Sequence, residues 1–91
     1  MSQIHIVHPH ARTPAQARQA VEQAAAKLHT RFGVASHWQD DTLHFARPGV
    51  EGRIALQPGQ VEVEARLGLL FSAFQSLAED EIRRVLAEKL G

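Results

Sequence analysis

The chain has 91 residues, with ten Lys and Arg against ten Asp and Glu, six His and no Cys. This length predicts a single domain, residues 1–91, whose small core would gain stability if the chain formed a homodimer. Balanced charge argues against nucleic acid as a partner, and the lack of Cys excludes disulfides, thiolate nucleophiles and sulfur-rich zinc sites.

The first third of the sequence predicts a strand followed by a helix. Residues 3–8 read as a strand, because Ile side chains alternate with other residues at a period of two. A helix is predicted over 14–32, since Thr13 can cap it and Pro14 suits its first turn. Gly33 is expected to end this helix in a left-handed conformation. The apolar face of the helix is rich in Ala, which predicts close packing on a sheet.

Four strands are predicted after this helix, at residues 34–39, 42–47, 52–57 and 61–67. The acidic pair at 40–41 joins the first two as a tight hairpin. This two-residue loop would set Trp38 opposite Leu43 on one face and His37 opposite His44 on the other. The middle of the chain therefore predicts an antiparallel hairpin with two imidazoles facing each other.

Two Pro-Gly dipeptides, at 48–49 and 58–59, mark the turns around the third of these strands. The last two strands alternate apolar with charged residues, which predicts a meander with one buried face. In this register Arg53 lies opposite Glu64. We interpret the two as an exposed ion pair, because no second carboxylate or nucleophile is indicated beside them.

The C-terminal segment predicts a second helix that begins at Ser76. Ser76 and Glu79 have the spacing of a capping box, and the acidic residues at 79–81 would favour the first turn of the helix. The full order is strand, helix, four-strand meander, helix. It predicts an α+β fold, an antiparallel meander with an N-terminal strand and a helix at each end, and it resembles a shortened helix-grip arrangement.

Few residues suggest a catalytic or metal-binding site. His37 and His44 are weak candidates for a metal site, because two imidazoles without a third ligand are more often solvent-facing strand residues. None of the four Ser residues lies in a nucleophile motif, and the sequence has no phosphate-binding glycine loop. We therefore expect no catalytic residues, no cofactor and no bound metal.

The densest apolar stretch runs from Leu67 to Leu77. It has two open interpretations: a hinge whose side chains fill the core, or an exposed surface that binds something apolar. Exposed large side chains would favour a partner, since each forfeits about 1.5–3 kcal/mol in water. The candidate binding residues are Leu67, Leu69, Leu70, Phe71 and Phe74.

Several segments resemble the polyhydroxyalkanoic acid system proteins, a family linked to bacterial storage polyester. The resemblance covers nearly the whole chain. It is carried by Ile4-His5-Ile6, Trp38, Asp41-Thr42-Leu43-His44-Phe45, Gly49 to Gly52, Ile54, Ala65-Arg66-Leu67-Gly68, Phe74 and Glu81-Ile82-Arg83-Arg84. It implies a place in polyhydroxyalkanoate metabolism, at or near the granule surface in the bacterial cytoplasm, and it implies no defined reaction.

Two functional hypotheses follow. The leading one is a non-enzymatic accessory protein that binds a polyhydroxyalkanoate granule surface, or a granule-associated protein, through the apolar stretch. The alternative is a small ligand-binding or enzymatic module with an apolar cavity between the sheet and the C-terminal helix, lined by Phe45, Ile54, Leu56 and Val63. Both place the protein in the cytoplasm, since no signal-peptide pattern and no apolar run of about 18 residues is present.

Overall fold

Strands and helices follow one another in the predicted order in the computed structural model, which describes residues 2–91. They are β1 (Ser2–Pro9), α1 (Pro14–Phe32), β2 (Ala35–Gln39), β3 (Thr42–Arg47), β4 (Val50–Gln57), β5 (Gln60–Leu67), the short 3₁₀ helix η1 (Ser72–Phe74) and α2 (Gln75–Leu90). The α+β class is confirmed. No helix within the described residues is long and apolar enough to cross a membrane.

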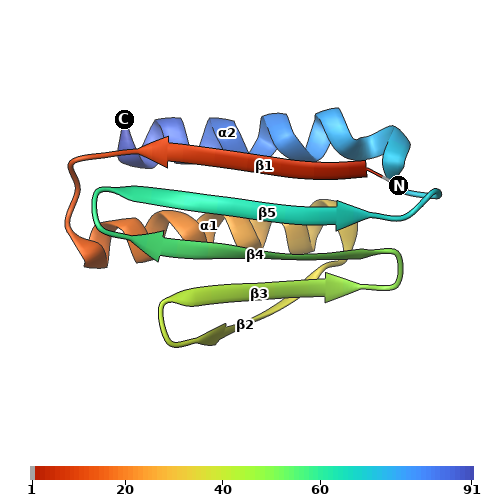
Figure 1. Ribbon diagram of the computed structural model, residues 1–91, viewed down its shortest axis with the longest axis horizontal. Coiled ribbons are helices and arrows are strands. Elements are labelled where there is room, and N and C mark those ends of the chain that lie inside the picture. Colours follow the sequence, from red (N-terminus) through yellow and green to blue (C-terminus); the bar gives the residue numbers. More distant parts are fainter. Residues whose placement is uncertain (1) are drawn as a thin grey trace.

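The five strands form one antiparallel sheet in the order β1-β5-β4-β3-β2. Figure 1 shows the meander from β2 to β5, with β1 added beside β5 at the far edge. The predicted register is confirmed: Trp38 lies opposite Leu43, and His37 lies opposite His44. Asp40 makes this hairpin without Gly because it adopts a φ of 55°, a conformation that Asp tolerates better than most residues.

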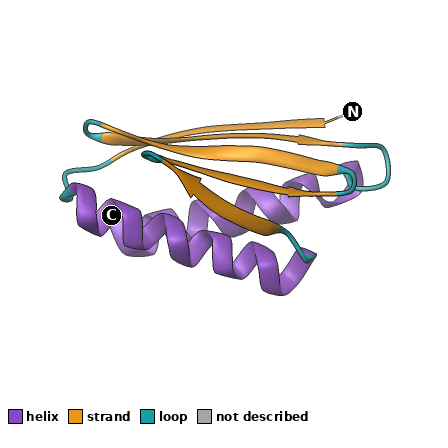
Figure 2. Cartoon of the chain, turned by 90° about the horizontal axis from the view of Figure 1, so that it is seen from below, coloured by secondary structure: helices purple, strands orange, loops and turns teal. Residues whose placement is uncertain are grey.

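Both helices cover the same face of the sheet, and the other face is open to solvent (Figure 2). The covered face supplies the core, because the inward side chains of β1, β3, β4 and β5 are apolar. Ala17, Ala20 and Ala24 are buried on α1. They lie on the face of α1 that is turned toward the core, as its Ala-rich pattern predicts.

The N-terminus of α1 is capped as predicted. The Thr13 hydroxyl accepts a hydrogen bond from the Gln16 backbone N–H at 3.2 Å, and the Gln16 side chain accepts one from the Thr13 N–H at 3.1 Å. Gly33 follows the helix with a φ of 70°. Helix α1 therefore begins at its Thr13 cap and ends before Gly33, as the sequence predicts.

Removing the cap should weaken the fold measurably. We expect Thr13→Ala to lower the free energy of unfolding by about 1 kcal/mol, because it leaves backbone N–H groups unpaired. Thr30→Ala is the matched control, since the exposed Thr30 hydroxyl only donates to the Ala26 carbonyl within the same helix. Urea unfolding of both variants would contradict the prediction if their midpoints fell equally.

The start of α2 differs from the prediction. The helix begins at Gln75, directly after η1, and Phe74 occupies the N-cap position without a side-chain hydrogen bond. Ser76 already lies inside the helix, so it does not cap, and no acidic residue lies in the first turn. The capping-box prediction was wrong because η1 supplies the preceding turn and starts the helix earlier.

Candidate functional site

The apolar stretch between β5 and α2 divides into buried and exposed parts. Leu67 belongs to the core, and Phe71 packs against the core with the Arg47 guanidinium 4.6 Å from its ring centre. Leu69 and Leu70 are 80% and 86% exposed. The stretch is therefore part of the core at some positions and exposed at others.

A tight turn holds Leu69 and Leu70 outward. The Gly68 N–H donates to the Gly49 carbonyl at 2.8 Å, which ties the end of β5 to the β3–β4 turn. The Phe71 N–H then donates to the Gly68 carbonyl at 3.0 Å, and the Ser72 hydroxyl donates to the Leu69 carbonyl at 2.9 Å. These hydrogen bonds fix the backbone before and after Leu69 and Leu70, which lie at the outer end of the turn.

Two further apolar side chains are exposed close to this tip in the sequence. Phe74 is 43% exposed and Leu77 is 50% exposed. The Phe74 ring meets the Phe32 ring edge-on, with the ring centroids 6.4 Å apart. It also contacts the Phe71 ring, whose centroid is 6.3 Å away. We call Leu69, Leu70, Phe74 and Leu77 the apolar tip. Leu69 and Leu70 are its most exposed members, whereas Phe74 is partly held by its ring contacts with Phe32 and Phe71.

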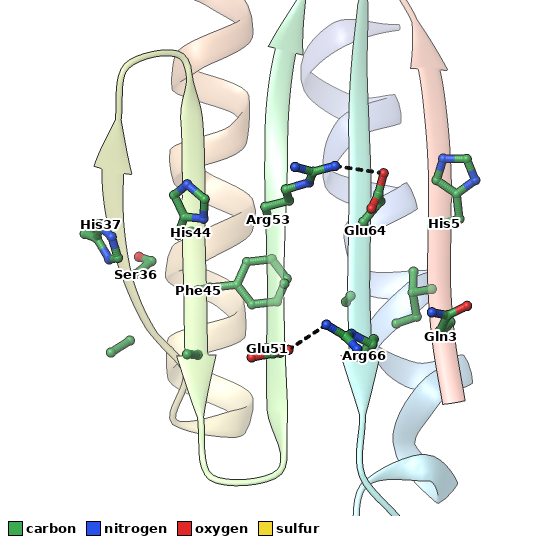
Figure 3. Close-up of a pocket in the computed structure, with 15 residues that line it drawn as sticks. Gln3, His5, Ser36, His37, His44, Phe45, Glu51, Arg53, Glu64 and Arg66 are labelled. Atoms are coloured by element: carbon green, nitrogen blue, oxygen red, sulfur yellow. Dashed lines mark hydrogen bonds and ion pairs between the residues drawn. The ribbon is translucent and has the colours of Figure 1, made fainter. Parts of the chain in front are cut away.

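The open face of the sheet carries a second feature, a hollow of about 750 Å³ that extends over all five strands. Figure 3 shows its polar lining, with Arg53 paired to Glu64 and Arg66 paired to Glu51. The two distances between guanidinium nitrogen and carboxylate oxygen are 3.2 Å and 3.1 Å. The predicted Arg53–Glu64 pair is confirmed as an exposed ion pair.

The two facing histidines lie at one side of this hollow. The rings of His37 and His44 are stacked, with centroids 5.5 Å apart and an angle of 23° between their planes. Stacked rings direct their nitrogens alongside one another rather than at a common point. Within residues 2–91 neither ring belongs to a group of three neighbouring His, Asp or Glu ligands.

A cluster that the sequence did not predict lies at the other side, where β1 meets β5. His5 donates from Nε2 to a Glu62 carboxylate oxygen at 2.9 Å, and Glu64 lies directly opposite His5 in the strand pairing. The hydrogen bond from His5 lowers the pKa of Glu62 below its ordinary value. Alternation places Glu62 and Glu64 on one face, but only the β1–β5 pairing brings His5 to them.

A small apolar cavity of about 20 Å³ lies between the sheet and the helices, with Ile4, Phe45 and Phe71 among its lining residues. That volume accommodates about one water molecule. Ile54 and Val63 are fully buried in the core, and neither is among the residues that line this cavity.

Comparison with known proteins gives one match. No curated protein and no solved structure matches the chain. A family model described as "Putative polyhydroxyalkanoic acid system protein" matches residues 4–90, which include most of β1, the other four strands and both long helices. Because this match covers almost the whole sequence, the chain belongs to the polyhydroxyalkanoic acid system family.

Proposed function

We propose that this chain is a non-enzymatic accessory protein of polyhydroxyalkanoate metabolism, and that it binds the surface of the storage granule in the cytoplasm through the apolar tip. The exposure of Leu69 and Leu70 carries the proposal, because a folded domain rarely leaves two adjacent leucines 80% or more exposed on an ordered turn. Membership of the family supplies the process.

Binding through the apolar tip would remove its exposed leucine side chains from water. Transfer of one Leu side chain from water to an apolar phase is favourable by about 1.5–3 kcal/mol, and a polyester surface is such a phase. The turn is already ordered by its hydrogen bonds, so little conformational entropy is lost on binding. Leu67 and Phe71 serve as the anchors that hold the turn against the core.

A contact function also fits the polar residues of the hollow. Arg53 and Arg66 each form an ion pair with a Glu on the neighbouring strand, so their charges are largely neutralised within the sheet. The alternative of an apolar ligand site between the sheet and α2 requires a cavity much larger than the 20 Å³ present there. We therefore favour surface binding over an enclosed ligand site.

The test is co-sedimentation with isolated polyhydroxyalkanoate granules. We expect Leu69→Asp combined with Leu70→Asp to move the protein from the granule pellet to the supernatant, because the charges would have to be desolvated at the surface. Folding should be unchanged, since neither side chain packs in the core. Ala11→Asp combined with Gln39→Asp is the control, because it adds the same charge at two other exposed positions.

Equal pelleting of the wild type and the tip variant would contradict the proposal. Granules treated with protease to remove their surface proteins distinguish binding to the polyester from binding to a protein on the granule. Retained binding of the wild type indicates that the polyester itself is recognised, whereas loss of binding after shaving indicates a granule-associated protein and overturns the assignment to the polymer.

A further inference from the structure

The cluster at the β1–β5 junction has the composition of a metal site. His5 contributes an imidazole nitrogen, and Glu62 and Glu64 contribute carboxylate oxygens from the neighbouring strand. One ligand atom from each residue lies within 4.8 Å of the other two. The imidazole distinguishes this group from a patch of acidic residues, because nitrogen and carboxylate oxygen together are the donors that zinc takes in proteins.

The geometry requires only a small adjustment to surround an ion. Zinc binds such ligands at about 2.0–2.2 Å, which places neighbouring ligand atoms of a tetrahedral site about 3.3 Å apart. His5 Nε2 and Glu62 Oε2 are already 2.9 Å apart. All three side chains are at least partly exposed and stand on one sheet face, so rotation about side-chain bonds can bring Glu64 inward without moving the backbone.

The present partners of the carboxylates leave room for an ion. Gln57 donates to the Glu62 oxygen other than the one that His5 contacts, at 3.1 Å, and can stay in place as an outer support. Arg53 holds Glu64 at 3.2 Å, but this pair is exposed and therefore weak. A divalent ion can displace the Arg53 guanidinium at small cost.

We propose that His5, Glu62 and Glu64 bind one divalent transition-metal ion, with zinc the best match to the donor set. This departs from the expectation of a chain without a metal, and it selects His5 rather than the stacked pair of histidines. Three protein ligands leave at least one coordination position open. His5 and Glu64 also line the hollow on the open face, so that position is accessible to water or to an oxygen ligand from solution.

The experiment is calorimetric titration of the tag-free protein with zinc chloride. We expect one zinc per chain. His5→Gln and Glu62→Gln should each reduce the affinity at least about 100-fold, because loss of a direct ligand exceeds the effect of losing an outer partner. His44→Gln is the matched control on the same sheet face and should leave the affinity unchanged. Arg53→Gln should raise it up to about fivefold by releasing Glu64.

Circular dichroism of each variant establishes that it is folded, so that a lost signal reports the site. The proposal is overturned if the folded wild type shows no saturable binding at one zinc per chain. It is also overturned if His44→Gln abolishes binding while His5→Gln retains it, since the ion would then lie at the stacked histidines. Neither result bears on granule binding, which uses residues of the apolar tip.

Discussion

Gly52→Ala is expected to lower the free energy of unfolding by about 3 kcal/mol, because β4 passes too close to its neighbours for any side chain at this position. A Cβ at Gly52 would lie 2.5 Å from the Glu64 carbonyl oxygen, 2.5 Å from the Phe45 ring and 2.9 Å from the Ala65 Cα. Two of these obstacles are backbone of β5, which cannot turn away. Figure 3 shows the Phe45 ring reaching across β4.

The measurement is thermal unfolding followed by circular dichroism, in which a loss of this size corresponds to a decrease of the melting temperature of about 12–24 °C. Gly68→Ala is the matched control. A Cβ there would meet nothing closer than the Gly49 carbonyl oxygen at 3.5 Å, an ordinary contact. The control should therefore stay within about 0.5 kcal/mol of the wild type. Equal melting temperatures for the two variants would refute the steric argument.

Glu81→Ala is expected to have the second largest effect, a loss of about 2 kcal/mol. Glu81 is the one buried charged residue within the described part of the chain, at 5% exposure. Its carboxylate oxygens form ion pairs with the side-chain nitrogens of Arg31 at 3.3 Å and Lys27 at 3.9 Å, both on α1. Arg84 on α2 is a third partner at 3.4 Å. Removing the carboxylate leaves three cations near one another without an anion. It also breaks the ion pairs that connect α1 to α2.

Urea unfolding of Glu81→Ala and Glu81→Gln measures this link, and Gln is included because it nearly preserves side-chain volume. Glu79→Ala is the control on the same helix. Its partner Arg83 is 3.8 Å away, and a partly exposed helical pair of this kind typically contributes no more than about 0.5 kcal/mol. If Glu79→Ala destabilised the protein as much as Glu81→Ala, burial of the carboxylate would not be the source of the effect.

The parts of the fold that the sequence predicts correctly are those set by local interactions. Thr13 and Gly33 delimit α1 because caps act on the adjacent turn. The short turns of the meander set the register, so the position of His37 opposite His44 follows from counting residues away from the turn at 40–41. Alternation then assigns each strand residue to a face.

The errors and omissions concern features that the local pattern does not determine. Ser76 has the spacing of a cap, but η1 had already started the helix. Apolar density identifies the stretch that contains Leu69 and Leu70, yet it does not distinguish these from Leu67, because exposure depends on how the turn is anchored to Gly49. The cluster of His5, Glu62 and Glu64 was missed because His5 and Glu62 lie 57 positions apart in the sequence.

The position of β1 has a consequence for how the protein assembles. Strands β2 to β5 are joined by two-residue turns, so each hairpin closes quickly between near neighbours in the chain. Ile6, by contrast, pairs with Val63, and this contact requires closure of most of the polypeptide. Within this sheet β1 precedes the other four strands in the chain, yet its partner β5 comes last of the five. We therefore expect β1 to join the sheet after the β2–β5 meander has formed.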